Sequence, residues 1–188
     1  MKKIGITGSL ASGKTTASKI LSLSKGPLFN ADVVVKNLYK KNSFRKIISK
    51  RFNIKNTLNI KRSLKNKIKE DETNIQKLEK IVHPLVRKEM YKFIRKNKKK
   101  KFIFLEIPLL IESKLMNYFD IIFFIKARKS IRLRRFLSKG GKREIFNILN
   151  KKQLTDTVKI KYSDYVVVNE KKFKVLKEKL LNIFKKYE

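Results

Sequence analysis

The chain has 188 residues and contains neither cysteine nor tryptophan. Without cysteine, the protein has no disulfide bonds and no metal sites with thiolate ligands. Disulfide-free chains are typical of reducing compartments, so we expect a cytoplasmic location.

Long apolar runs are missing as well. No stretch is long enough to cross a bilayer, although 41% of the residues are hydrophobic, which is enough to form a buried core. The first residues, Met1-Lys2-Lys3, lead into a short apolar segment and not into a secretory signal. We therefore expect one domain, with small insertions at most, and no membrane segment.

Acidic residues are few. The chain has 15 of them against 50 Lys and Arg, which gives a net charge of +35. Such a charge favours nucleic-acid binding, but Lys is spread over the whole chain and Ile and Asn are also abundant, which favours a biased composition. In either case the field attracts polyphosphate substrates and nonspecific polyanions. The sequence implies no specific protein partner.

Short apolar segments alternate with amphipathic ones along the chain. This alternation predicts an α/β fold with a parallel five-stranded sheet, and no internal repeat is present. Residues 53–72 are polar and weakly patterned. The expected strands are 3–7, 28–29, 102–107, 121–125 and 165–168; the expected helices are 14–24, 33–41, 44–52, 73–98 with a kink or break at Pro84, 109–116, 129–137, 144–162 and 173–187.

A phosphate-binding motif follows the first expected strand. Gly8, Gly13, Lys14 and Thr15 match the pattern of a glycine, four residues, then Gly-Lys-Ser/Thr. Glycines let backbone N–H groups turn toward phosphate oxygens. Lys14 supplies charge to the β- and γ-phosphates, Thr15 can ligate Mg²⁺, and the next helix adds its positive N-terminal end.

An incidental glycine turn is the alternative interpretation of this motif. Lysine is common in the chain, so Lys14 alone means little. Glycine is rare, however, and three of the six glycines fall within the first thirteen residues. A strand before the motif and a helix after it are also the context that a phosphate loop requires, so we interpret the motif as a nucleotide site.

Two carboxylates follow or end expected strands. Asp32 comes after the second strand, which predicts a place at the carboxyl edge of the sheet beside the phosphate loop. There it could orient or deprotonate an attacking hydroxyl, or merely cap a helix. Glu106 lies in an apolar strand and needs a partner. That partner could be Mg²⁺, a water on the metal or Lys14. Alternatively, Glu106 is an edge residue or part of a structural ion pair.

His83 and a basic cluster remain ambiguous from their patterns alone. A lone histidine is more often packed or capping than catalytic. Basic residues around a Gly-Gly loop suit a lid that closes over phosphates, but they also suit a solvated lysine-rich surface. The basic residues are Arg132, Arg134, Arg135, Lys139, Lys142 and Arg143.

The order of these motifs resembles the dephospho-CoA kinase family nearly from end to end. The family pattern begins with a strand, a G-x-x-x-S-G-K-S/T loop and an Asp-Ala-Asp element. These are followed by a His-Pro pair, Pro-Leu-Leu-x-Glu, an Asp before the next strand, an Arg-rich helix with a lid, a glutamine and an Ala-Asp-x-Val-Ile-x-Asn ending. The matching residues are 8–15, Asn30-Ala31-Asp32, His83-Pro84, 108–112 after Glu106, Asp120, Arg135, Gln153 and 163–169.

The resemblance implies roles for individual residues. Asp32 would face the ribose 3′-hydroxyl of dephospho-CoA, and Lys14 and Arg135 would act on the phosphates of ATP. Thr15 and Glu106 would hold Mg²⁺. ATP would contact Gly8, Ser9, Leu10, Ala11, Ser12, Gly13, Lys14, Thr15, Thr16 and Asn169, and the acceptor would contact Asp32, His83, Glu106 and Pro108.

The resemblance also implies a three-layer P-loop kinase with core residues 1–32 and 99–188, a helical acceptor-binding region at about 33–98 and a lid at about 136–145. The sequence departs from the pattern at Asn30, where the family has Asp, and at Lys139-Gly140, where the family has a second Arg-Asp pair. Another small-acceptor kinase, such as a nucleotide or nucleoside kinase, remains an alternative. A nucleotide-dependent nucleic-acid-binding protein is a further one.

Overall fold

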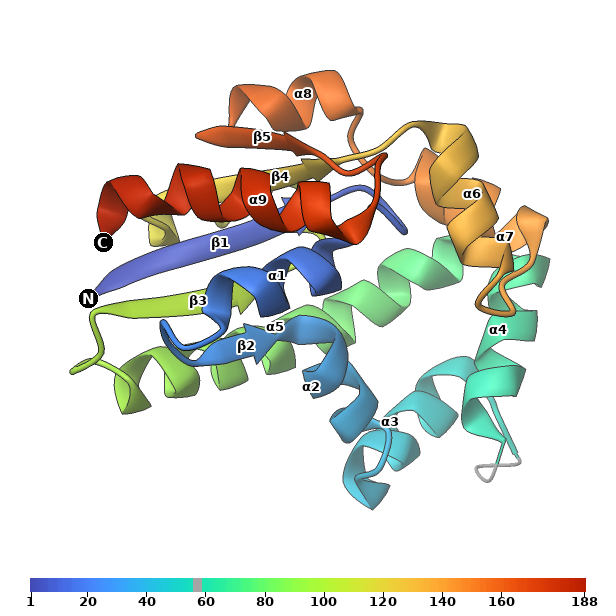
Figure 1. Cartoon of the computed structure of the whole chain (residues 1–188). Helices are drawn as coiled ribbons and strands as arrows, with labels where there is room; N and C mark the ends of the chain where they lie inside the picture. Colours follow the sequence, from blue (N-terminus) through green and yellow to red (C-terminus); the bar gives the residue numbers. More distant parts are fainter. Residues whose placement is uncertain (56–58) are drawn as a thin grey trace. The chain divides into compact units, whose positions relative to one another are not determined.

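The computed structural model describes residues 1–55 and 59–188 (Figure 1). It divides into two compact units. The first comprises Met1–Asn30 and Lys96–Glu188, and the second comprises Ala31–Arg95. Within the described residues, no helix is both long and apolar enough to span a membrane.

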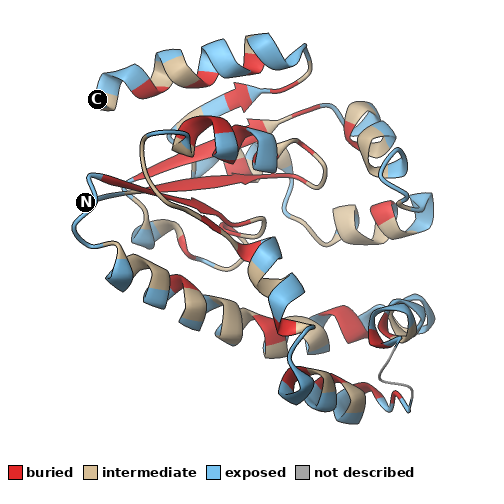
Figure 2. Ribbon diagram, turned by 60° about the horizontal axis from the view of Figure 1, so that its bottom comes forward, coloured by how far each residue is buried: buried red, intermediate tan, exposed pale blue. Residues whose placement is uncertain are grey.

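The first unit is built on a five-stranded sheet in which all neighbouring strands are parallel, in the order β2-β3-β1-β4-β5. β1 therefore lies at the centre, and the phosphate loop leaves its carboxyl end. Figure 2 shows the central strands buried along most of their length, as near-continuous apolar runs predict. The strands are β1 (Lys2–Gly8), β2 (Leu28–Asn30), β3 (Phe102–Glu106), β4 (Ile121–Lys126) and β5 (Tyr165–Val168).

Two helices cover one face of the sheet. α1 (Lys14–Ser22) contributes Ala17 and Leu21 to the core, and α9 (Phe173–Phe184) contributes Leu180. These side chains pack on alternate strand residues, because successive residues of a strand point to opposite faces. Packing of α1 on β1 and β3 fixes the helix whose N-terminus receives the phosphate loop.

The segment after β3 approaches the opposite face at Gly5. A Cβ at this glycine would lie 2.9 Å from Leu110 Cδ1 and 3.0 Å from the Phe119 ring. The residue must therefore be small for the segment to pack closely. Further along the chain are η1 (Met116–Tyr118), α6 (Lys129–Leu137), α7 (Arg143–Lys151), α8 (Asp156–Lys161) and η2 (Lys185–Tyr187).

The second unit is helical and has its own apolar core. Phe44, Ile48 and Phe52 lie four residues apart on one helix, so they share one face. They pack with Leu64 and Val82 from other helices. The helices are α2 (Ala31–Leu38), α3 (Asn42–Phe52), α4 (Ile60–Glu70) and α5 (Thr73–Lys96), of which α5 ends in the first unit.

The five strands, α1, α2, α3, α6 and α9 confirm the sequence-based elements to within a few residues. Two expectations were wrong. In place of a helix at 109–116, turns run to residue 114 and η1 begins at Met116, and 144–162 form two helices with a break at 152–155. The weakly patterned 53–72 segment, for which no element was specified, contains α4, whose apolar residues are few; residues 56–58 lie outside the described part.

A kink or a break was expected at Pro84. The break does not occur, because α5 runs through Pro84 as one helix. Proline lacks one backbone N–H and disfavours a helix interior. Residues on both sides of Pro84 pack in the second unit, including Val82, Leu85 and Val86. We infer that this packing outweighs the local cost.

Candidate active site

The phosphate loop takes a backbone shape that depends on its second glycine. Gly13 has φ 100° and immediately precedes α1. A Cβ there would lie 2.1 Å from Asn169 Nδ2, so a larger residue would displace Asn169 as well as strain the backbone. Ala11 also has positive φ, at 60°. The loop therefore holds a costly conformation, as phosphate-binding loops and other functional turns do.

Lys14 lies within the curve of this loop. Its ammonium donates to the carbonyl oxygens of Gly8 and Ser9, each at 3.0 Å, and the side chain is buried. These bonds hold the charge beside the N-terminus of α1, which itself favours anions. The arrangement suits the β- and γ-phosphates of a nucleotide.

Glu106 is the best connected carboxylate of the site. It ends β3, is 1% exposed, and accepts hydrogen bonds from Thr15 Oγ1 at 2.6 Å and from Ser18 Oγ at 2.9 Å. Asn30 Nδ2 also donates to it. Asn30 and Glu106 are partners in the β2–β3 register, which brings the two side chains together. The ends of three elements thus meet at one carboxylate.

Asn30 is one of the departures from the family pattern, and its contact gives that departure a physical meaning. An amide donates a hydrogen bond to Glu106, whereas an ionised aspartate at the same place could only accept one. Two adjacent carboxylates would repel each other. The substitution therefore lowers the negative charge at this end of the sheet and adds a donor.

The residues expected to hold Mg²⁺ fit that ion. Thr15 and Glu106 are in direct contact and offer the hard oxygen ligands that Mg²⁺ prefers. Glu106 is buried, and a buried carboxylate requires polar or charged partners. The described residues contain no cluster of three His, Cys, Asp or Glu side chains. Phosphate oxygens and water would complete the shell, as is usual for Mg²⁺.

Asn169 and Arg135 meet at a single backbone atom of the loop. Asn169 Nδ2 donates to the Ser12 carbonyl oxygen at 2.8 Å, and Arg135 Nη1 donates to the same oxygen at 3.3 Å. Asn169 directly follows β5, and Arg135 lies on α6. Two residues far apart in the sequence, each singled out by its motif, therefore border the loop.

The basic loop between α6 and α7 is closed by short-range contacts. Gly140 has φ 78°, and the Gly141 N–H donates to the Phe136 carbonyl oxygen at 3.0 Å. A Cβ at Gly141 would lie 2.2 Å from the Phe136 ring, which in turn packs on Phe146. The two glycines thus allow a tight return of the chain, while Lys139 remains exposed.

Three further residues were expected at the site: Pro108, Asp32 and His83. Pro108 is half-buried, and its carbonyl oxygen accepts a hydrogen bond from Thr7 Oγ1 at 3.2 Å. Asp32 is exposed in the first turn of α2. His83 lies half-buried on α5. Asp32 and His83 belong to the second unit, so their approach to the phosphates remains a prediction.

Burial lowers the pKa of His83 from its ordinary value of 6.5. Glu79 opposes this shift and Arg87 adds to it. The imidazole is therefore neutral at pH 7, and one of its ring nitrogens can accept a hydrogen bond while the other donates.

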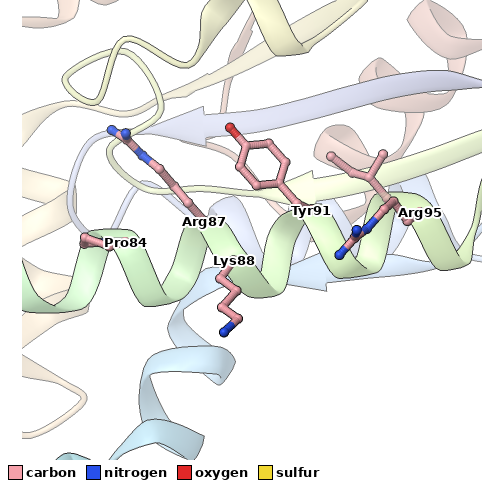
Figure 3. A pocket seen from close by; sticks show the side chains of 6 residues that line it. Pro84, Arg87, Lys88, Tyr91 and Arg95 are labelled. Atoms are coloured by element: carbon pink, nitrogen blue, oxygen red, sulfur yellow. The ribbon is translucent and has the colours of Figure 1, made fainter.

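A pocket of about 650 Å³ runs along α5 just after His83 (Figure 3). Its lining repeats every three or four residues, so it occupies one side of the helix. In Figure 3 the side chains of Arg87 and Tyr91 extend to the same side of the helix. The lining residues are Pro84, Arg87, Lys88, Tyr91, Ile94 and Arg95. Three cations beside apolar surface suit an anionic ligand with an apolar part.

Two contacts of the site escaped sequence analysis. Ser18 lies four residues after Lys14 on α1, a spacing that could have indicated a shared helix face. Asp156 accepts a hydrogen bond from Ser9 Oγ at 2.5 Å. No pattern could have found it, because residues 144–162 had been predicted to form one helix and the loop at 152–155 is what brings Asp156 to Ser9.

Known proteins provide an independent comparison with this geometry. The family model described as dephospho-CoA kinase matches residues 2–174. A dephospho-CoA kinase from Rickettsia typhi is 35% identical over 168 residues, covering 89% of this chain and 87% of its own. One from Fusobacterium nucleatum is 32% identical over 195 residues, covering 98% and 94% of the two chains.

A solved structure from Thermus thermophilus superimposes with a TM-score of 0.78 at 25% identity, covering 98% of this chain and 97% of its own. The family pattern had been inferred from separate motifs, and the site brings the phosphate-loop, strand and lid-helix parts of it together. Sequence similarity over nearly the whole chain and a shared fold agree with that inference. The chain belongs to the dephospho-CoA kinase family.

Proposed function

We propose that the protein transfers the γ-phosphoryl group of ATP to the ribose 3′-hydroxyl of dephospho-CoA, giving coenzyme A and ADP. The observation that carries this proposal is the joining of Lys14, Thr15 and Glu106 around the phosphate loop of a dephospho-CoA kinase family chain. In the reaction the hydroxyl oxygen bonds to the γ-phosphorus, the bond from phosphorus to the bridging oxygen breaks, and ADP leaves.

The residues of the first unit would bind and orient ATP. Backbone N–H groups of the phosphate loop would bind the phosphates, and Lys14 would stabilise the charge that develops on the oxygen between the β- and γ-phosphates. Asn169 would lie near the adenine. Arg135 would contact the transferring phosphoryl group from α6.

Thr15 and Glu106 would hold Mg²⁺, Thr15 through its hydroxyl oxygen and Glu106 directly or through water. A bound Mg²⁺ neutralises phosphate charge and fixes the orientation of the phosphate chain. Glu106 is positioned for this by Ser18 and Asn30, whose hydrogen bonds fix its carboxylate plane.

We assign the acceptor to the helical region at about 33–98. Asp32 would accept the proton of the 3′-hydroxyl as that oxygen attacks. Neutral His83 and Pro108 would contact the acceptor. The pocket on α5 would take the diphosphate of dephospho-CoA against Arg87 and Arg95, because guanidinium groups match phosphate oxygens with two parallel hydrogen bonds.

The basic loop at about 136–145 would act as a lid. Closure over both substrates would exclude water, which otherwise competes with the ribose hydroxyl for the phosphoryl group. Its cations would also lie near the phosphates. Together with the lack of cysteine, the proposed reaction fits a cytoplasmic location.

An acceptor screen tests this proposal. Purified protein is supplied with ATP and Mg²⁺, and ADP release is measured with dephospho-CoA, nucleosides, nucleoside monophosphates or oligonucleotides. We expect dephospho-CoA to give the highest kcat/KM and coenzyme A to form in equal amount to ADP. A much better nucleoside or nucleotide acceptor would refute the assignment. Stimulation by oligonucleotides alone would favour the nucleic-acid alternative suggested by the +35 charge.

A further inference from the structure

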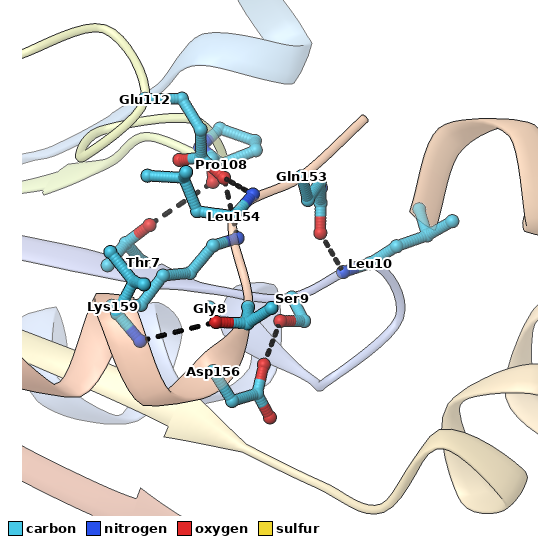
Figure 4. A network of polar contacts seen from close by, with 12 residues as sticks. Thr7, Gly8, Ser9, Leu10, Pro108, Glu112, Gln153, Leu154, Asp156 and Lys159 are labelled. Carbon is cyan, nitrogen blue, oxygen red and sulfur yellow. Dashed lines mark hydrogen bonds and ion pairs between the residues drawn. The ribbon is translucent and has the colours of Figure 1, made fainter. Parts of the chain in front are cut away.

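Gln153, between α7 and α8, and Asp156, the first residue of α8, hold the part of the phosphate loop that precedes Ala11. Ser9 Oγ donates to Asp156 Oδ1 at 2.5 Å, and the Leu10 N–H donates to Gln153 Oε1 at 3.0 Å (Figure 4). Successive residues of the loop are thus bound by two side chains three positions apart in one segment. These side chains lie more than 130 residues from the loop in sequence.

The carbonyl side of Leu10 is held as well. Arg132 Nη1 donates to the Leu10 carbonyl oxygen at 3.3 Å and to Asn150 Oδ1 at 2.8 Å, and Arg132 is 6% exposed. Burial lowers the pKa of its guanidinium, and the charge of Asp156 works in the opposite direction. The Asp156 carboxylate therefore interacts with both the loop and the arginine beside it.

The bracing segment is itself fixed to the protein interior. The Lys159 side chain is fully buried, and its ammonium lies 2.7 Å from Glu112 Oε1. The same carboxylate oxygen accepts a hydrogen bond from the Leu154 N–H at 3.3 Å. Thr155 caps α8 by accepting from the Val158 N–H. A buried ammonium is costly without its partner, so this pair fixes where α8 begins.

Other residues hold the part of the loop that would face the phosphates and metal. Lys14 donates to the Gly8 and Ser9 carbonyl oxygens, and Thr15 donates to Glu106. A non-glycine residue with positive φ, such as Ala11, persists in that conformation only where its surroundings determine it. Asp156, Gln153 and Arg132 supply that support through their contacts with Ser9 and Leu10.

We propose that Asp156 and Gln153 are positioning residues that preform the phosphate loop for ATP. The inference deepens the proposed function and rests on it for the identity of the nucleotide. The two residues touch neither substrate; they reduce the conformational freedom that the loop would lose on binding. Their removal therefore weakens ATP binding and leaves acceptor binding unchanged.

A double-mutant cycle tests the Ser9–Asp156 contact. The dissociation constant for ATP is measured by calorimetry for the parent, Ser9→Ala, Asp156→Ala and the double variant. We expect each single change to weaken ATP binding roughly tenfold and the double change to add little, because both remove the same hydrogen bond. The KM for dephospho-CoA should stay at the parent value. Glu178→Ala, at an exposed site on α9, is the matched control and should bind ATP normally.

Amide hydrogen exchange gives a readout that needs no nucleotide. In Gln153→Ala the Leu10 amide loses its partner and should exchange at least severalfold faster, while it should be unchanged in Glu178→Ala. If Asp156→Ala destabilises α8, Ser9→Ala still removes the contact from the loop side. Unchanged ATP affinity in Ser9→Ala, full additivity in the cycle, or unchanged exchange at Leu10 would each overturn the inference.

The outcomes separate this inference from the proposed function. A parent protein that binds ATP but does not phosphorylate dephospho-CoA would refute the proposed acceptor, and the cycle would still decide the positioning role. A parent that binds no ATP would refute the nucleotide site. The exchange rate of the Leu10 amide would then decide whether Gln153 braces the loop.

Discussion

Thr15 Oγ1 donates a 2.6 Å hydrogen bond to Glu106 Oε1, which joins the start of α1 to the end of β3. The contact links a residue of the phosphate motif to a carboxylate 91 positions further along the chain. It places a hydroxyl and a buried carboxylate where a metal-bound nucleotide would need them. This arrangement leads to predictions for the residues proposed to bind the nucleotide and for those proposed to bind the acceptor.

Glu106→Gln should raise the Mg²⁺ requirement. Glutamine keeps the size and an acceptor oxygen, but it loses the negative charge that attracts the cation. We expect the Mg²⁺ concentration for half-maximal activity to rise about tenfold or more, the range for loss of a group that supports a metal. A Mg²⁺ titration at saturating ATP measures this. An unaltered titration curve would show that Glu106 is purely structural.

Lys14→Ala should abolish most phosphoryl transfer while the protein stays folded. The ammonium would stabilise charge that grows in the transition state, and loss of one such group costs roughly 100-fold or more in rate. The initial rate of coenzyme A formation measures the effect, with circular dichroism to check folding. Near-parental turnover in a folded variant would contradict the role assigned to the phosphate loop.

Asp32→Asn should keep the fold and ATP binding but lose at least about 100-fold in kcat with dephospho-CoA. A positioned carboxylate base contributes roughly 10²–10⁴-fold, and asparagine has nearly the same shape without accepting the proton. Comparing kcat with the dissociation constant for ATP separates the two effects. If the variant turns over at the parent rate, Asp32 serves only to cap α2.

His83 should make stability depend on pH. Its pKa is lowered in the folded protein, so below about 6.5 the unfolded chain binds the proton first and unfolding becomes more favourable. The stability that neutral His83 contributes is therefore fully present above about pH 6.5 and is lost as the pH falls toward the lowered pKa. Urea unfolding between pH 7.5 and 5.5 should show a steeper loss for the parent than for His83→Asn. Parallel curves for the two proteins would contradict the pKa shift.

The loop at 138–142 should exchange its amide hydrogens quickly in the free protein and more slowly with ATP and dephospho-CoA together. Ser138, Lys139 and Gly140 are exposed, so their short-range hydrogen bonds open easily. Closure over the substrates would protect them. Hydrogen exchange with mass spectrometry measures this, with β1 as the internal reference. Equal exchange in both states would rule out a lid at these residues.

Local patterns determined much of this protein. The scarcity of glycine made Gly8 and Gly13 informative, and the strand before them and the helix after them followed from apolar periodicity alone. The apolar run of β3 identified a central strand, and Glu106 within it was expected to need a polar partner. These inferences succeeded because a buried parallel strand and a phosphate loop each have a short-range signature.

Tertiary structure decided which partners those residues have. From the sequence alone, the partner of Glu106 could be a metal, Lys14 or another ion-pair residue. The β2–β3 register and the packing of α1 bring Asn30, Ser18 and Thr15 within hydrogen-bond distance of its carboxylate. Residues 144–162 had a continuous helical pattern, yet the chain breaks at 152–155, where Gln153 binds the Leu10 N–H. No local pattern encodes this break, because the free energy that favours it comes from contacts with residues more than 40 positions away, at Leu10 and Glu112.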